Sequence, residues 1–121
     1  MSSSTTTSAS TPANTAFSVP KITSAFDVEI TLPGSKSIAL RQLAIAALCK
    51  GTTQIRGIPQ CDDSAAMLDC IEALGASVTR FTDYIEVVGP IDFSSRVVKL
   101  DARMSGASTR LLLGLAALRQ G

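Results

Sequence analysis

The chain has 121 residues, of which 45% are hydrophobic, so it is long enough for about one domain with a buried core. The net charge of +1 and the aromatic content of 4%, with no Trp, argue against a nucleic-acid-binding surface. No apolar run is long enough to cross a bilayer. From the charge, the aromatic content and the apolar runs together, we expect neither nucleic acid nor a membrane as a partner. The three cysteines, in a chain without His, predict reduced thiols in a cytoplasmic protein and no metal site.

The chain begins with a Ser/Thr-rich tract that carries no charge, and we interpret residues 1–16 as a disordered tail. Residues 17–121 are expected to fold. Two short strands are predicted first, at 16–22 and at 27–32, the second because polar and apolar residues alternate along it.

The remaining elements are predicted from helical spacing of apolar residues, from alternation, and from glycines at the ends of helices. In chain order they are a helix at 37–49, a strand at 53–57, a helix from 62–64 to 75, hairpin strands at 77–81 and 84–88, a strand at 97–100 and a last helix at 105–120.

The most informative stretch is Leu-Pro-Gly-Ser-Lys-Ser, which ends at Ser37 and is followed by Arg41. It places a glycine turn, hydroxyl groups and the cation of Lys36 at the start of a helix, where free N–H groups and the helix dipole also attract anions. Acidic residues are absent from positions 30–61. If Ser37 opens the helix, Arg41 lies one turn on, on the same face. The pattern predicts a site for a phosphate or carboxylate.

Each of these residues also has a purely structural interpretation. Lys36 could be a solvated lysine, Ser37 could serve only as an N-cap, and Arg41 could pair with the acids at 62 and 63. Those two acids, Asp62 and Asp63, are predicted to cap the second helix and to have no catalytic role. A lysine at a helix start opposes the dipole by about 0.3 to 1 kcal/mol, which favours a ligand that offsets this cost.

A short internal repeat, which we call the echo, links two segments 70 residues apart. Ala46–Gly51 is similar in sequence to Ala116–Gly121. A glycine, hydroxyl and cation cluster precedes each helix, and the second cluster contains Gly106 and Arg110. Gly106 could serve only close packing, and for Arg110 a buried ion pair is favoured. The echo predicts an α/β fold of repeated strand-helix-strand-helix-strand-strand units, with helices packed beneath a mixed sheet. The chain ends once a second unit has its first helix, so we expect a fragment of a longer protein.

Together the two motifs resemble those of the enolpyruvyl transferases, over about residues 26–121. In that family Leu-Pro-Gly-Ser-Lys-Ser is followed four residues later by Arg, as here at Arg41, and a second motif of the type Gly-Asn-Ala-Gly-Thr-x-x-Arg corresponds to Arg103–Arg110. The resemblance is strongest to the members that act on shikimate 3-phosphate. It implies transfer of the enolpyruvyl group of phosphoenolpyruvate to the 5-hydroxyl of shikimate 3-phosphate, with release of phosphate, on the route to aromatic amino acids.

By the same resemblance, Lys36 would contact both substrates, Ser37 and Arg41 would hold shikimate 3-phosphate, and Gly106 would let the backbone approach phosphoenolpyruvate. Residues 17–121 would be the N-terminal part of the enzyme domain, inactive alone, with no catalytic acid or base among them. Neither a metal nor a cofactor is implied, and the complete enzyme would be a monomer.

Three departures from the family pattern remove a polar side chain from beside the expected site. Leu40 and Met104 stand where the family usually has Asn, and Ala107 stands where it usually has Thr. Two alternatives therefore stay open at this point. One is an enolpyruvyl transferase for a different acceptor, and the other is a non-enzymatic α/β module that binds RNA phosphates through Lys36 and Arg41.

Overall fold

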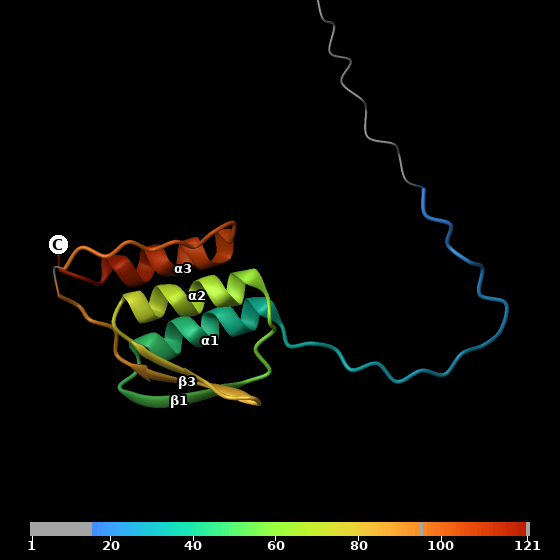
Figure 1. Ribbon diagram of the computed structural model, residues 1–121, viewed down its shortest axis with the longest axis horizontal. Helices are drawn as coiled ribbons and strands as arrows, with labels where there is room; N and C mark the ends of the chain where they lie inside the picture. Colours follow the sequence, from blue (N-terminus) through green and yellow to red (C-terminus); the bar gives the residue numbers. More distant parts are fainter. Residues whose placement is uncertain (1–15, 95, 121) are drawn as a thin grey trace, which may run out of the picture. The chain divides into compact units, whose positions relative to one another are not determined.

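The computed structural model describes residues 16–94 and 96–120, and most of the expected tail lies outside these residues. Contacts divide the chain into two units, residues 1–30 and residues 31–121, and the described part of the first contains no helix or strand. Within the described ranges, no helix has the length and apolar character needed to span a membrane. The second unit contains, in order, α1 (Lys36–Leu48), β1 (Gly51–Arg56), α2 (Asp62–Ala73), β2 (Ser77–Arg80), β3 (Tyr84–Gly89) and α3 (Gly106–Ala117) (Figure 1).

The sheet has β3 at its centre, in the order β1-β3-β2. Both outer strands run antiparallel to β3, with Arg56 of β1 opposite Tyr84 and Ser77 of β2 opposite Val88. β1 and β2 therefore point the same way, and α2 connects them. The expected α/β class is confirmed. Every strand pair among the described residues is antiparallel, where a mixed sheet was expected.

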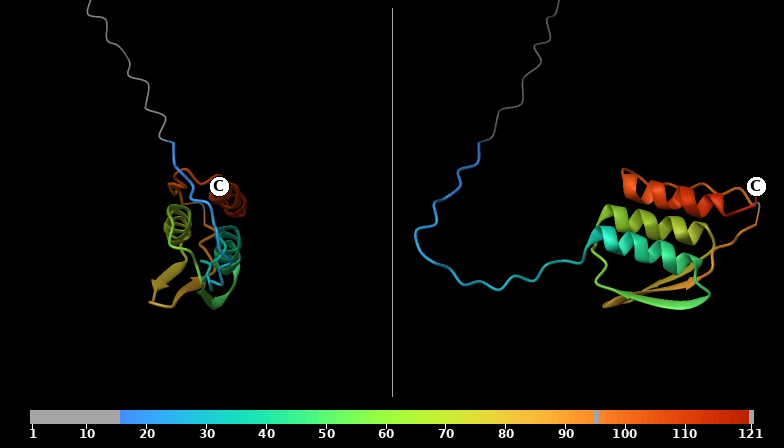
Figure 2. Two further views of the ribbon diagram at one scale, coloured as in Figure 1. Left: turned by 90° about the vertical axis from the view of Figure 1, so that its right-hand side faces the viewer. Right: turned by 180° about the vertical axis from the view of Figure 1, so that it is seen from behind.

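The helices cover one face of this sheet, because their apolar residues recur at helical spacing. α1 and α2 lie against the sheet, and α3 packs on them from the side away from it (Figures 1 and 2). Each such side chain stabilises the fold by about 1.5–3 kcal/mol when it is fully buried. The largest fully buried hydrophobic side chains are Leu40, Leu43, Met67, Ile71, Leu74, Val87 and Ile91.

The expected strands at 16–22, 27–32 and 97–100 do not form. A strand needs hydrogen bonds to a neighbouring strand, and the described residues supply none to these segments. In the second segment the alternating residues Val28, Ile30 and Leu32 are 62–79% exposed, so they find no core there either. In the third, Leu100 packs against the core from an irregular segment.

The hairpin and the helices agree with expectation to within a residue or three. Ser35 caps α1 by accepting from Ile38 N–H at 3.5 Å, so Ser35 and not Ser37 opens this helix. Ser105 caps α3 in the same way, accepting from Ser108 N–H at 3.2 Å. The two caps lie 70 positions apart, the offset of the echo in the sequence, which supports a structural repeat.

Candidate anion-binding site

The three helices start at the same end of the second unit (Figures 1 and 2). Two contacts at their first turns show this directly. Lys36 Nζ at the start of α1 lies 2.7 Å from an Asp63 carboxylate oxygen of α2. Ser108 Oγ of α3 donates to the Asp63 carbonyl oxygen at 3.5 Å. The positive dipole ends of α1 and α3, whose first turns carry no acid, therefore converge, which favours a bound anion.

The start of α1 carries three of the predicted site residues, Lys36, Ser37 and Arg41, and all three are exposed. Arg41 Nη1 donates to the Ser37 carbonyl at 2.8 Å and also to the Ser37 hydroxyl. This confirms that the two residues share one face of the helix. Neither acid at 62 or 63 pairs with Arg41 among the described residues, so its guanidinium remains open to solvent.

The start of α3 carries the fourth predicted residue, Gly106, which is exposed. A Cβ built at this position would meet nothing within 4 Å, so packing within the described chain does not require glycine here. The turn around it is ordered by Ser105 and Ser108, which are buried and joined by a 2.8 Å hydrogen bond between their hydroxyls. The first turn of α3 is therefore rigid from within and open on its outer side.

Arg110, one turn further along α3, was interpreted as one half of a buried ion pair, and this is wrong. The residue is exposed, and no acid among the described residues lies within ion-pair distance of it. The helix buries Leu112 and Leu115 instead, which places position 110 on the solvent side.

The sequence did not reveal what Asp62 and Asp63 do. They occupy the first turn of α2, where acids complement the dipole, but the residue at the cap is Cys61 and its side chain makes no capping bond. Their carboxylates reach outward in two directions, Asp63 to Lys36 and Asp62 to Arg103. The available signal was two consecutive acids at one predicted helix start, in a sequence that also has cations near the starts of two other helices.

The Lys36–Asp63 pair changes the titration of both groups. Its hydrogen bond, and then the charge of Asp63, raise the pKa of Lys36 above its ordinary value of 10.5. The same hydrogen bond lowers the pKa of Asp63 below its ordinary value of 3.8. At neutral pH both groups are therefore charged, and the lysine keeps the cation that an anionic ligand needs.

We expect the free energy of unfolding to fall in acid, because this ion pair is lost there. The Asp63 pKa is lowered by folding, so its contribution is present above about pH 4 and is lost as the pH falls through the lower folded value. Urea midpoints of wild type and Asp63→Asn should differ at neutral pH and converge as the pH falls through the lowered pKa of Asp63, where the carboxylate becomes protonated. Asp83→Asn, in the hairpin turn, is the control. A difference independent of pH would contradict the assignment.

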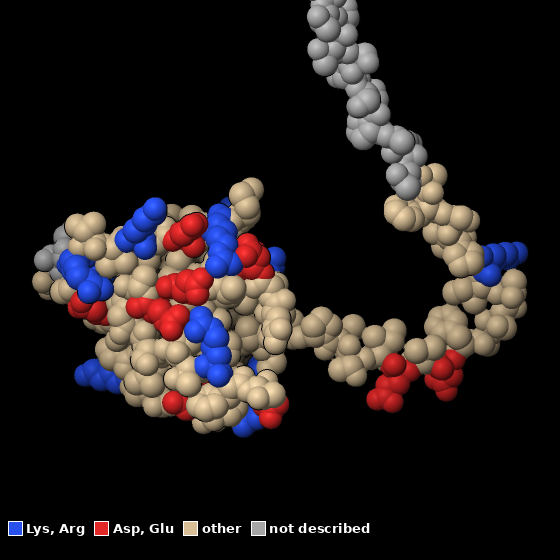
Figure 3. Space-filling view, in the orientation of Figure 1, with Lys and Arg blue, Asp and Glu red and all other residues tan. Residues whose placement is uncertain are grey.

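A cleft of about 710 Å³ lies beside the first turn of α2, between this helix, the loop before it and the β2–β3 hairpin. Its lining includes Arg80 and Tyr84 but none of the four predicted site residues. The Arg80 guanidinium is already engaged with Asp69 and Glu72 at 3.4 and 3.2 Å. Figure 3 shows acidic and basic side chains interleaved over this side of the molecule. Among the described residues that line it, the cleft therefore offers no cation outside an ion pair that compares with the exposed Arg41 at the start of α1.

The fold and this geometry define an α/β unit whose helix starts gather hydroxyls and cations at one end, the candidate anion site. The sequence profile of the EPSP synthase family (3-phosphoshikimate 1-carboxyvinyltransferase) matches residues 20–121. The chain belongs to the EPSP synthase family, which confirms the resemblance seen in its motifs.

Individual relatives agree. The chain is 39% identical over 90 residues to the 3-phosphoshikimate 1-carboxyvinyltransferase of Carboxydothermus hydrogenoformans, covering 74% of this chain and 21% of that protein. It is 40% identical over 88 residues to the protein of the same name from Clostridium tetani, covering 71% and 20%. Among solved structures, EPSP synthase from Acinetobacter baumannii superposes with a TM-score of 0.58 at 28% identity, over 71% of this chain and 20% of that one. The chain spans about a fifth of the length of the relatives it matches.

Proposed function

We propose that residues 17–121 act as the N-terminal part of an EPSP synthase, which transfers the enolpyruvyl group of phosphoenolpyruvate to the 5-hydroxyl of shikimate 3-phosphate and releases phosphate. The observation that supports this most is the convergence of the α1 and α3 starts, which brings Lys36, Ser37, Arg41 and Gly106 to one end of the fold. Both substrates are multiply charged anions. A preorganised set of cations and helix N–H groups is the arrangement that holds two such ligands together.

Each predicted residue has a role in this proposal. Lys36 is the first residue of α1, with its ammonium beside the first turn of α2, and contacts both substrates. Ser37 and Arg41, joined by hydrogen bonds on one face of α1, hold shikimate 3-phosphate, for which the forked guanidinium suits a phosphate. Gly106 leaves open space beside the first turn of α3, where the backbone can approach phosphoenolpyruvate.

The departures from the family pattern differ in whether the side chain is buried or exposed near the candidate site. Leu40 is 1% exposed and packs in the hydrophobic core, so it forms part of the support beneath Arg41. Met104 is 96% exposed, next to the cap of α3, and Ala107 is exposed in its first turn. Substrate contacts that depend on these two positions are the ones we expect to differ from those of typical family members. The family assignment does not favour a non-enzymatic RNA-binding module.

The setting of the enzyme is part of the same proposal. Cys49, Cys61 and Cys70 are all free thiols, which suits a reducing cytoplasmic compartment. The complete enzyme is proposed to act as a monomer without a metal or organic cofactor.

The proposal is tested by assaying the complete polypeptide for phosphate release from phosphoenolpyruvate and shikimate 3-phosphate. Release should require both substrates, and residues 1–121 alone should show none because most of the relatives' length is missing. A complete polypeptide that is folded but releases no phosphate from this pair, or uses another acceptor better, would refute the proposed substrates.

Arg41→Lys should weaken binding of shikimate 3-phosphate by roughly tenfold and leave phosphoenolpyruvate binding within about twofold. Lysine keeps the charge but loses the fork and the bonds to Ser37, a loss of about 1.5 kcal/mol for a charge-assisted contact. Calorimetric titration of each substrate measures this, with Arg56→Lys on the outer face of the sheet as the matched control. Unchanged affinity for the acceptor would count against the role given to Arg41.

A further inference from the structure

Arg103 adopts a backbone conformation that its residue type disfavours. It lies two residues before Ser105, the cap of α3, and has a φ of +52°. Among the described residues it is the one non-glycine residue with a positive φ. A side chain in this region is strained, and such a conformation persists only where the surroundings hold it in place.

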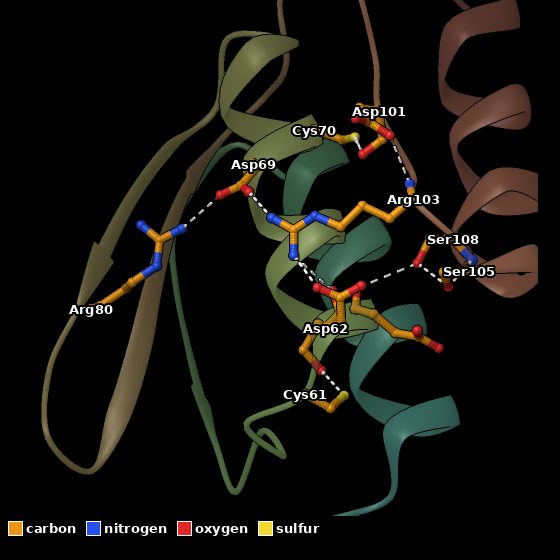
Figure 4. Close-up of polar contacts among 11 residues, drawn as sticks. Cys61, Asp62, Asp69, Cys70, Arg80, Asp101, Arg103, Ser105 and Ser108 are labelled. Carbon is orange, nitrogen blue, oxygen red and sulfur yellow. Dashed lines mark hydrogen bonds and ion pairs between the residues drawn. The ribbon is translucent and has the colours of Figure 1, made fainter.

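Three carboxylates hold Arg103 (Figure 4). Its backbone N–H donates to Asp101 Oδ1 at 2.9 Å. One end of its guanidinium, Nη1, pairs with Asp62, and the other end, Nη2, donates to Asp69 Oδ2 at 2.9 Å. Asp62 and Asp69 are seven residues apart, two turns along one face of α2. The side chain therefore lies along α2 and joins the segment before α3 to it.

This attachment continues to α1. Asp63, the residue next to Asp62, binds Lys36 at the start of α1, and Ser108 of α3 donates to the Asp63 carbonyl. The first turn of α2 is thus linked to both neighbouring helix starts, through Asp63 on one side and through Asp62 and Arg103 on the other.

We propose that Arg103 is a positioning residue, which fixes the start of α3, with Gly106, relative to Lys36 at the start of α1. The inference rests on the proposed function. Both Nη atoms of Arg103 are occupied by carboxylates, so it acts through the α3 start and not on substrate.

The network is better suited to setting geometry than to holding the fold together. The side chains of Arg103, Asp62 and Asp69 are 37%, 64% and 55% exposed, and ion pairs this open to solvent add little to global stability. The effect of removing the guanidinium should therefore be confined to the α3 start.

The test is Arg103→Asn in the complete polypeptide, because Asn tolerates a positive φ and keeps the backbone N–H bond to Asp101, while the guanidinium that reaches Asp62 and Asp69 is removed. We expect the KM for phosphoenolpyruvate to rise at least fivefold, with kcat and the KM for shikimate 3-phosphate within twofold. The amides of Ser108 and Thr109, which bond to Ser105, should exchange with solvent at least tenfold faster. The melting temperature should stay near that of wild type, and Arg103→Lys should recover part of both effects.

Arg80→Asn is the matched control, since Arg80 pairs with Asp69 but belongs to β2 and does not touch the α3 segment. It should change neither the phosphoenolpyruvate KM nor the two exchange rates. Unchanged exchange at Ser108 and Thr109 in Arg103→Asn would overturn the proposal, whether or not the protein has the proposed activity. A lower melting temperature with unchanged kinetics and exchange would overturn it in favour of a purely structural role. If wild type releases no phosphate, the proposed function fails while the exchange rates still decide this inference.

Discussion

Lys36→Met in the complete polypeptide is expected to lower kcat/KM by well over tenfold. The substitution keeps the length of the side chain but removes its charge, and a charge-assisted contact to an anionic substrate is worth about 1.5 to 3 kcal/mol. Because Lys36 is proposed to contact both substrates, the KM values for phosphoenolpyruvate and shikimate 3-phosphate should rise together. Steady-state kinetics with each substrate varied in turn measures this.

The structure supplies the control for this variant. Lys50 lies just beyond the opposite end of α1 and is also exposed, so Lys50→Met removes the same charge far from the helix starts. It should leave both KM values near those of wild type. Lys36 and Asp63 are partly solvated, so the folded fraction of Lys36→Met should stay close to that of wild type. Near-normal kinetics in Lys36→Met would refute its place in the site.

Local pattern was enough to predict the helices. α1 buries Leu40, Leu43 and Ala47 at spacings of three and four, and a glycine with a φ of +98° follows it at position 51. The β2–β3 hairpin was also visible, because its two strands are neighbours in the sequence. The pattern at 27–32 was just as regular, yet no strand forms there. Alternation shows only that a segment suits a sheet, and pairing depends on residues elsewhere in the chain.

The candidate site likewise contains contacts that local spacing predicts and contacts that it does not. Ser37 and Arg41 were placed on one face because residues four apart on a helix are neighbours. The partners of the cations could not be found by spacing: Arg103 and Asp62 are 41 positions apart and meet only because α2 and α3 start at the same end. Asp63 was interpreted as part of a helix cap for this reason. Its contact with Lys36 depends on how two helices pack, which no local pattern encodes.

Gly34→Ala is expected to disturb both the fold and the site, because Gly34 in the turn before α1 has no room for a side chain. A Cβ there would overlap the carbonyl oxygen of Gly57, in the loop between β1 and α2. Both atoms belong to backbone, so no side chain can rotate away. Either the start of α1 or the loop before α2 must move, at about 1–3 kcal/mol for overpacking of this kind.

Any such movement separates residues that the site needs together. The Gly57 loop leads directly into α2, whose first turn holds Lys36 through Asp63. We therefore expect Gly34→Ala to unfold at a lower urea concentration and to raise the KM for phosphoenolpyruvate by several-fold. Gly114→Ala is the control, since a Cβ at that position in α3 meets nothing and alanine favours a helix by about 0.5–1 kcal/mol. Gly114→Ala should leave binding unchanged and keep or improve stability. Equal urea midpoints for wild type and Gly34→Ala would show that the turn can open without cost, and the close approach of Gly34 to Gly57 would then not be what positions α1.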